Sequence, residues 1–288
     1  MTSLTIINTS DDTELSPDTL STVLSDRGLA YGHGVFETML SCKGEIPLKD
    51  RHLQRLRRGA ERLGIPFLMD DIYSAIDNIN STSECIIKII LTAGNGGVGY
   101  QNPQQIEPKL IISRHQLPTD FKNQRERGIK LWQCQQRLSR NTALAGIKHL
   151  NRLEQVLARN EPHSDEYTDG IMLDQWGNVI ETTSANIFIK LPNKGWVTPN
   201  LDDSGVEGVM RSLLLDEVFP NLAIACITDR IKQVQLEQSC ELFICNSVRG
   251  IVPITGIESQ NGAMKTLSIG ENTQTLQRAL HCFFSCLS

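Results

Sequence analysis

Hydrophobic residues recur along the chain with two different periods, and each period predicts one kind of element. Between positions 50 and 64 the apolar residues are three or four positions apart, which is typical of a helix with one buried face. These residues are Leu53, Leu56, Ala60 and Leu63. Gly64 and Pro66 then end the predicted helix. Two short runs rich in isoleucine, 84–91 and 109–113, predict strands.

The second half of the chain continues the mixture of strands and helices. Apolar runs predict strands at 130–134, 170–173, 179–181, 186–189 and 241–245, and helices at 150–160, 208–218 and 273–284. The segment 115–124 has few apolar residues and contains Pro118. We therefore predict a domain at 1–117, a linker at 118–124 and a second domain at 125–288, in an α/β or α+β fold.

Composition narrows the function classes. The 288 residues carry a net charge of −5, which provides no electrostatic footprint for nucleic acid. No apolar stretch is long enough to span a membrane, and the first residues contain neither a basic nor an apolar signal region. The eight cysteines are scattered. We interpret them as reduced thiols of a cytoplasmic protein that acts on a small molecule.

Lys148 lies in the mostly apolar, glycine-containing segment LAGIKHL, immediately before a predicted helix. Two interpretations are open. The lysine could lie at the surface with its aliphatic stem packed on neighbours. Alternatively, a less polar environment could lower its pKa and prepare the amine to form a Schiff base.

The run LAGIKHLNRLEQVL closely resembles the cofactor-lysine segment of bacterial aminodeoxychorismate lyases. These are fold-type IV enzymes that depend on pyridoxal 5′-phosphate (PLP), as are the branched-chain and D-amino acid aminotransferases. Further segments resemble the family in the same order: SDRGLAYGHGVFET, HLQRL, ETTSANIF with GVEGVMR, and ICNSVRGIVPI. The resemblance implies a homodimer whose subunits have a smaller N-terminal α/β domain and a larger C-terminal PLP-binding domain.

The resemblance also implies a role for individual residues. Lys148 would carry the cofactor, and Glu181 would pair with its protonated ring nitrogen. The phosphate would be bound by Arg55, by the backbone N–H groups of Val209 and Met210, and by Asn246 and Ser247. From the pattern alone, Glu181 could instead be an exposed acid at a strand end, and Arg55 could be a solvated residue on the polar side of its helix.

The segment YGHGVFET is predicted to be a turn near the active site, with Thr38 as a candidate proton donor or relay. Two departures from the lyases concern the substrate. Their loop usually reads Arg-Gly-x-Gly-Gly-Arg-Gly-Tyr, whereas residues 93–100 read AGNGGVGY and lack both arginines, and His33 stands where an aspartate is common. Arg137, Arg140 and the retained Tyr100 are then the candidate substrate-binding residues.

The resemblance predicts conversion of 4-amino-4-deoxychorismate to 4-aminobenzoate and pyruvate in folate biosynthesis. The alternatives are a branched-chain or D-amino acid aminotransferase of the same fold and a catalytically silent PLP-binding protein. His149 is expected to be structural, because adjacent residues usually point apart. Asp202 and Asp203 are interpreted as solvated loop acids, since a hard cation needs more oxygen ligands at regular spacing.

Overall fold

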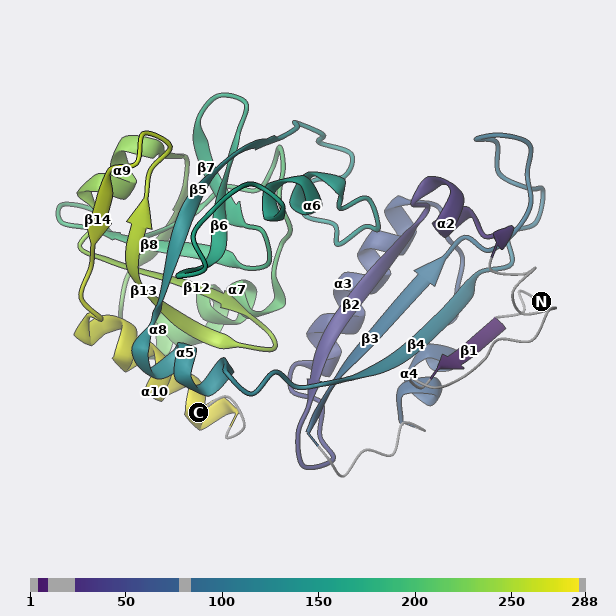
Figure 1. Cartoon of the computed structure of the whole chain (residues 1–288). Helices are drawn as coiled ribbons and strands as arrows, with labels where there is room; N and C mark the ends of the chain where they lie inside the picture. The colour runs from purple at the N-terminus through teal and green to yellow at the C-terminus, as the bar shows by residue number, and fades with distance from the viewer. Residues whose placement is uncertain (1–4, 10–23, 78–83, 285–288) are drawn as a thin grey trace. The chain divides into compact units, whose positions relative to one another are not determined.

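The computed structural model describes residues 5–9, 24–77 and 84–284. The chain separates into two compact units (Figure 1). Unit 1 comprises residues 1–117 together with 147–151, and unit 2 comprises residues 118–146 and 152–288. The segment that contains Lys148 is therefore part of the N-terminal unit, although it lies at the middle of the sequence.

Unit 1 is built on a four-stranded sheet in the order β1-β4-β3-β2, in which β1 is parallel to β4 and the other pairs are antiparallel. The strands are β1 (Thr5–Thr9), β2 (Gly34–Ser41), β3 (Cys85–Thr92) and β4 (Lys109–Gln116). The helices are α2 (Arg27–Tyr31), α3 (Lys49–Arg62) and α4 (Met69–Asp77), of which α3 and α4 lie on the same side of the sheet (Figure 1).

The two faces of this sheet differ because side chains alternate along each strand. Val35, Met39 and Ile87 are buried on the face that receives Leu53 and Leu56 of α3. The opposite face carries half-buried residues, which the register places side by side: Phe36 is paired with Ile90, and Thr38 with Lys88. The face that carries Phe36 and Thr38 also carries the candidate site described below.

Unit 2 contains a ten-stranded sheet in the order β10-β9-β8-β12-β13-β5-β6-β7-β11, with β14 paired to β13. Its strands are β5 (Ile129–Leu138), β6 (Tyr167–Asp174), β7 (Asn178–Thr182), β8 (Asn186–Leu191), β9 (Gly195–Pro199), β10 (Cys226–Asp229), β11 (Ile231–Lys232), β12 (Glu241–Asn246), β13 (Gly250–Glu258) and β14 (Met264–Thr266). Apolar residues of these strands, among them Ile187, Ile244 and Val252, form its core.

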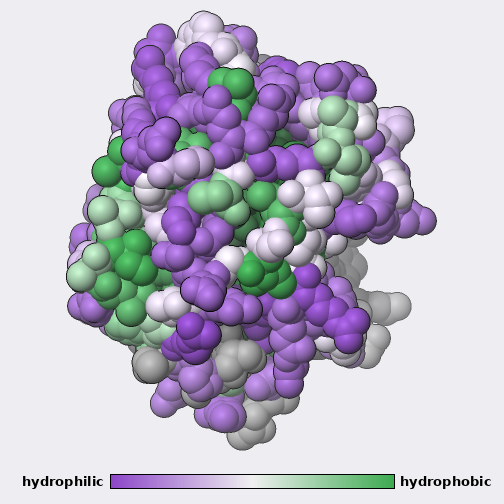
Figure 2. Space-filling model, turned by 90° about the vertical axis from the view of Figure 1, so that its left-hand side faces the viewer, coloured by the Kyte–Doolittle hydropathy of each residue, from purple (hydrophilic) through white to green (hydrophobic). Residues whose placement is uncertain are grey.

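The helices of unit 2 are short, apart from the last one. They are α5 (Phe121–Arg127), α6 (Leu153–Arg159), α7 (Val209–Leu213), α8 (Phe219–Asn221), α9 (Gln233–Gln238) and α10 (Glu271–Phe283), with a π-helical turn, η1 (Leu214–Val218), between α7 and α8. Figure 2 shows a mainly hydrophilic surface with scattered hydrophobic residues. Within the described ranges, no helix has the length and apolar character that a membrane crossing requires.

The mixed architecture and the predicted strands are confirmed, and three local predictions are corrected. The helix predicted from Leu150 begins only at Leu153, because residues 147–151 pair with unit 1. The helix predicted at 208–218 changes from α to π at Leu214. In YGHGVFET, Gly32 adopts a left-handed conformation at the end of α2, but the residues from Gly34 onward form β2 and not a turn. The predicted linker includes the first residues of α5.

Candidate functional site

Lys148 lies in a short extended segment that pairs with the free edge of β2. The Phe36 N–H donates to the Lys148 carbonyl oxygen at 2.9 Å, and the Leu150 N–H donates to the Gly34 carbonyl oxygen at 3.0 Å. Val35 and His149 form the antiparallel bridge between these two bonds. Residues directly opposite in an antiparallel pair share a face of the sheet, so Lys148 shares a face with Phe36.

The side chains of this segment alternate, and this separates Lys148 from its neighbours. A Cβ added at Gly59 of α3 would lie within 3.0 Å of side-chain atoms of both Ile147 and Val35. These two residues therefore lie on the face of the sheet that α3 covers. The Lys148 amine lies on the opposite face, where its Nζ is 4.3 Å from the centroid of the Phe36 ring. His149 is next to the lysine in sequence but belongs to the other face, as expected for adjacent residues.

Thr38 and Lys88 lie on the same face as Lys148. Thr38 follows Phe36 by two positions on β2, and Lys88 is its cross-strand partner on β3. Lys88 Nζ lies 5.5 Å from the Phe36 centroid, so this ring contacts two ammonium groups. The sequence analysis missed Lys88, since a lysine in the middle of ECIIKIIL has no distinguishing signal until the register of the strands is known.

Behind this face, unit 1 contains a buried cluster of Glu37, His52 and Arg55. Arg55 donates to both oxygens of Glu37, Nε to Oε1 at 2.7 Å and one terminal nitrogen to Oε2 at 2.5 Å. His52 Nδ1 is 2.6 Å from Oε2. Glu37 and His52 are fully buried, and Arg55 is 6% exposed. The solvated interpretation of Arg55 is therefore wrong, while its binding of a phosphate stays a prediction.

The pKa values in this cluster follow from burial and charge. Burial raises the pKa of Glu37, but the charges of Arg55 and His52 and their hydrogen bonds together outweigh burial and lower the pKa to about 2. Burial lowers the pKa of His52, an effect that Glu37 opposes and that Arg55 and Lys148 reinforce. The pKa of His52 therefore lies below its ordinary value. Its Nε2 has no hydrogen-bond partner within the described residues.

Glu181 is the penultimate residue of β7 and is only 5% exposed. The Val206 N–H donates to its Oε2 at 2.9 Å, and the Gln155 side-chain amide donates to Oε1 at 3.5 Å. The exposed strand-end interpretation is therefore wrong. A Cβ at Gly205, whose φ is +87°, would lie 2.7 Å from Ile180 and 3.4 Å from the Glu181 carboxylate, so the close approach of this backbone requires glycine.

The loop after Glu181 is held by a buried carboxylate that the sequence analysis missed. Asp169 on β6 is 1% exposed and accepts hydrogen bonds from Thr182, Thr183 and Ser184 in this loop. Arg249 donates to Asp169 at 3.0 Å and to the Ser184 hydroxyl at 2.7 Å. Burial raises the pKa of Asp169, but Arg249 and the hydroxyl donors outweigh it, so the pKa is lowered and the carboxylate stays ionised.

We expect Asp169→Asn to lower the free energy of unfolding by about 2–4 kcal/mol, because it leaves the Arg249 guanidinium buried without a counter-charge. Urea unfolding followed by circular dichroism measures this loss. Asp70→Asn, at an exposed position of α4, is the control and should change stability by less than about 0.5 kcal/mol. Equal stabilities for the two variants would contradict the structural role of Asp169.

Val209 and Met210 are the first two residues of α7 and are 4% and 0% exposed. The first N–H groups of an α-helix have no intrahelical acceptor and can bind an anion. The loop before the helix is tightly packed, since a Cβ at Gly208 would lie 1.9 Å from the Asn186 side-chain oxygen, and Asn186 also donates to the Val206 carbonyl at 2.9 Å.

Asn246 is the last residue of β12, and Ser247 follows it. The Asn246 side-chain oxygen accepts from the Val248 and Arg249 N–H groups at 3.1 and 2.7 Å, and its amide donates to the Ser184 carbonyl at 3.2 Å. Asn246 therefore joins the turn before Arg249 to the loop after Glu181. Ser247 is buried, with 9% exposed. Their contact with a phosphate stays a prediction.

The three candidate substrate-binding residues have different surroundings. Arg140 pairs with Asp203 at 2.9 Å, and its guanidinium lies 5.7 Å from the centre of the Trp176 ring. Arg137 donates to the Gln260 side chain at 3.2 Å. Tyr100 is 87% exposed in the glycine-rich loop of unit 1. Both arginines are in unit 2, and the hydrogen bonds to Asp203 and Gln260 show that each guanidinium already has a partner there.

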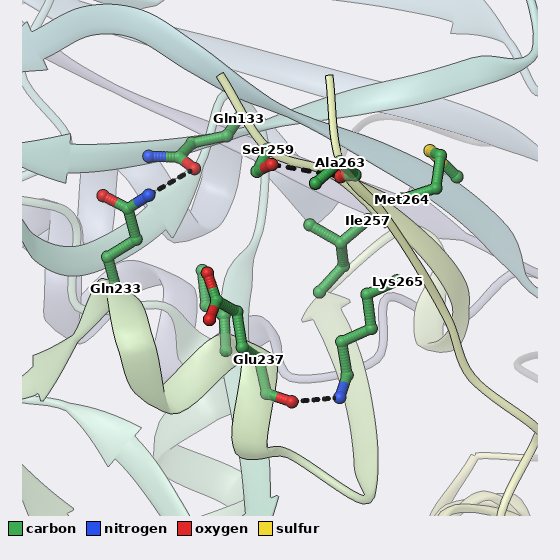
Figure 3. A pocket seen from close by; sticks show the side chains of 9 residues that line it. Gln133, Gln233, Glu237, Ile257, Ser259, Ala263, Met264 and Lys265 are labelled. Atoms are coloured by element: carbon green, nitrogen blue, oxygen red, sulfur yellow. Dashed lines mark hydrogen bonds between the residues drawn. The ribbon is translucent and has the colours of Figure 1, made fainter. Parts of the chain in front are cut away.

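A separate pocket of about 290 Å³ lies in unit 2 between β5, α9 and the β13–β14 hairpin (Figure 3). Gln233 donates to Gln133 at 3.1 Å across one side, and Lys265 donates to the Glu237 carbonyl at 2.6 Å on the other. None of the residues predicted to bind cofactor or substrate lines this pocket. It is therefore not the site that the sequence predicts.

Comparisons with known proteins identify relatives over most of the chain. Residues 34–257 match the family model "Amino-transferase class IV". The chain is 35% identical to a protein from Vibrio harveyi named aminodeoxychorismate lyase, over 90% of this chain and 95% of that one. It is 26% identical to a putative branched-chain-amino-acid aminotransferase from Methanocaldococcus jannaschii, over 88% of this chain and 87% of that one.

A solved structure is also similar over most of its length. The crystal structure of 4-amino-4-deoxychorismate lyase from Pseudomonas aeruginosa matches with a TM-score of 0.82 and 34% sequence identity, covering 94% of this chain and 95% of that chain. The predicted fold-type IV architecture is thereby confirmed. With the family model covering most of its length, this chain belongs to the amino-transferase class IV family.

Proposed function

We propose that this chain is a PLP-dependent aminodeoxychorismate lyase that converts 4-amino-4-deoxychorismate to 4-aminobenzoate and pyruvate in folate biosynthesis. The observation that carries the proposal is the position of the Lys148 amine, which lies on the face of the unit 1 sheet that also holds Phe36, Thr38 and Lys88. Relatives at 34–35% identity that bear the lyase name support this choice of reaction.

The chemistry of the available groups fits PLP. The chain offers the half-buried amine of Lys148 and the buried Glu181 carboxylate, which is oriented by the Val206 N–H. Glu181 would keep the ring nitrogen protonated, and the N–H groups of Val209 and Met210 would bind the phosphate. Asn246, Ser247 and Arg55 complete the proposed phosphate ligands. When bound, PLP supplies an electron-accepting ring for the reaction.

The residues of the chain would then move protons and orient the substrate. The Lys148 amine would act as the general base that removes the proton from the substrate carbon that bears the nitrogen. Loss of the enolpyruvyl oxygen makes the six-membered ring of the substrate aromatic, so this elimination is strongly favourable. Thr38 or Lys148 donates the proton that converts enolpyruvate to pyruvate. Phe36 restricts where the lysine amine can lie during these steps.

Lys88 is proposed to bind a substrate carboxylate, because it is a second cation at the Phe36 ring in a chain whose residues 93–100 lack both arginines of the lyase loop. We expect Lys88→Met to raise KM roughly 10- to 100-fold, since a hydrogen bond to a charged group contributes about 1.5–3 kcal/mol. Steady-state kinetics measure KM, and visible absorption reports the bound cofactor. Lys122→Met, at an exposed position of α5, is the control, and equal KM values for the two variants would contradict the role.

An end-product assay tests the reaction itself. Purified protein incubated with 4-amino-4-deoxychorismate should yield 4-aminobenzoate and pyruvate in equal amounts. The main alternative is a branched-chain or D-amino acid aminotransferase, a reading that the Methanocaldococcus relative favours. Transfer of an amino group to a 2-oxo acid without release of pyruvate would support that alternative and reject the lyase.

The proposal includes a cytoplasmic homodimer. One surface of unit 2 is consistent with a partner, because α6 exposes three large apolar residues at helical spacing: Leu153, Val156 and Leu157, which are 68%, 50% and 51% exposed. Sedimentation equilibrium of the purified protein tests the dimer directly. A monomer at micromolar concentration would reject it.

A further inference from the structure

Arg27 in α2 is buried, with 4% exposed, and its guanidinium contacts one loop repeatedly. It donates to the carbonyl oxygens of Gly96 at 3.0 Å, Gly99 at 3.4 Å, Tyr100 at 3.0 Å and Gln101 at 3.2 Å. All four acceptors lie in residues 93–101, which we call the glycine loop and which follow β3. One side chain from another part of the sequence therefore determines the path of this loop.

The glycine loop is built closely around this guanidinium. Gly94, Gly96, Gly97 and Gly99 all have positive φ values. A Cβ at Gly97 would lie 2.8 Å from an Arg27 nitrogen and 2.1 Å from the Gln101 carbonyl oxygen, so only glycine allows this approach. A run of glycines has high conformational freedom, and the four carbonyl bonds to Arg27 select one conformation from it.

Arg27 also reaches the Tyr100 side chain through Tyr31. The guanidinium carbon is 5.1 Å from the centroid of the Tyr31 ring, and the Tyr31 and Tyr100 rings make an edge contact at 5.3 Å. Tyr100 is thus held both at its carbonyl oxygen and at its ring, although 87% of the residue is exposed. Tyrosine is enriched at binding surfaces, where its ring packs and its hydroxyl reaches a polar partner, and loops often carry such residues.

The Nε of Arg27 and the carboxylate of Asp26 make further contacts next to the glycine loop. Arg27 Nε lies 3.3 Å from His33 Nδ1, while His33 Nε2 lies 3.0 Å from the Leu63 carbonyl oxygen. A carbonyl only accepts, so Nε2 carries the proton and Nδ1 accepts from Arg27. Asp26 accepts from the hydroxyl of Thr92, the last residue of β3, at 2.8 Å, immediately before the glycine loop.

We propose that Arg27 is the positioning residue of the glycine loop and acts on substrate binding by fixing Tyr100. The inference rests on the proposed function and on the sequence-based prediction that Tyr100 binds the substrate. In this chain the loop has no arginine of its own, and Val98, at the place of one of them, is 85% exposed. Arg27 therefore fixes the conformation of the loop, while its guanidinium binds loop carbonyl oxygens and not the substrate.

Kinetics of Arg27→Lys test the inference, since a lysine cannot donate to four carbonyls with the geometry of a guanidinium. We expect KM for 4-amino-4-deoxychorismate to rise roughly ten-fold, while kcat and the cofactor absorption change less than about two-fold. Tyr31→Leu should raise KM in the same direction without disturbing the buried cation. Leu29→Ala, at a position of α2 that is 63% exposed, is the matched control.

A double-mutant cycle with Tyr100→Ala separates positioning from general destabilisation. If Arg27 acts through Tyr100, Arg27→Lys should change KM less than about two-fold in the Tyr100→Ala background. Additive effects would overturn the inference. If Arg27→Lys does not fold, the same cycle is run with Tyr31→Leu.

Hydrogen exchange provides a readout that does not depend on the reaction. Amides of residues 94–101 should exchange faster in Arg27→Lys and Tyr31→Leu than in wild type or Leu29→Ala, and unchanged exchange would overturn the inference. A wild-type protein that forms no 4-aminobenzoate rejects the proposed function instead. The exchange comparison then still decides whether Arg27 orders the loop.

Discussion

Lys148→Ala is expected to abolish the visible absorption of the bound cofactor and to lower kcat/KM for the lyase reaction by at least about 10³-fold. The amine serves twice in the proposed reaction, first to hold PLP and then to move a proton from the substrate. General acid–base groups alone contribute about 10²–10⁴-fold to rates. Absorption spectra and the 4-aminobenzoate assay measure the two losses separately.

The substitution should leave the fold intact, and this makes the result interpretable. Lys148 joins unit 1 through its backbone, whose carbonyl oxygen accepts from the Phe36 N–H at 2.9 Å, and alanine keeps this bond. We therefore expect the thermal midpoint of the variant without cofactor to match that of the wild type without cofactor. Lys88→Met is the control for removing a charge beside Phe36, and it should retain the absorption. If Lys148→Ala still shows the visible absorption of the bound cofactor, Lys148 does not carry PLP and the proposed function is wrong.

Regular elements with one buried face could be predicted from the sequence. In β3 the residues Cys85, Ile87, Ile89 and Leu91 are buried and alternate with half-buried ones, and in α3 the apolar positions at helical spacing form the buried face. These patterns are local, so a single window of sequence contains the whole signal. The glycines of YGHGVFET predict a turn, whereas its residues from Gly34 onward form β2, a strand that depends on pairing with the distant β3.

The end of the lysine segment shows where local patterns fail. Leu150 and Asn151 continue the apolar and polar spacing of α6, so the sequence predicts helix. In the structure the Leu150 N–H donates to the Gly34 carbonyl oxygen of β2, and the Asn151 side-chain amide donates to the Gly32 carbonyl oxygen at the end of α2. These contacts with residues more than 110 positions earlier take precedence over helix propensity. No pattern within the segment reveals the partner strand.

The candidate site could be predicted where family motifs are continuous in sequence. Lys148 and Glu181 lie in such motifs, and the structure shows the first half-buried and the second buried. Lys88 could not be found in this way, because its position beside Lys148 depends on the register of β2 against β3. Asp169 and Arg249 are 80 positions apart, and each alone is an ordinary charged residue.

Glu37→Ala is expected to lower the free energy of unfolding at pH 7 by about 3–5 kcal/mol, which is the usual effect of removing one partner from a buried ion pair. The substitution leaves the Arg55 guanidinium 6% exposed and without its bidentate acceptor, and it removes the partner of His52. Chemical denaturation measures the loss. Glu61→Ala removes a carboxylate of α3 that is 64% exposed and pairs with Arg57, so it should cost less than about 1 kcal/mol.

The dependence on pH distinguishes a lost ion pair from lost packing. The pKa of Glu37 is about 2 in the folded chain and 4.5 as its ordinary value. A carboxylate with a lowered folded pKa stabilises the protein above the unfolded pKa, and this contribution disappears as the pH falls from about 4.5 toward 2. The stability difference between wild type and Glu37→Ala should therefore narrow over that interval. A difference that stays constant from pH 6 to pH 2.5 would mean that Glu37 stabilises unit 1 through its volume and not through its charge.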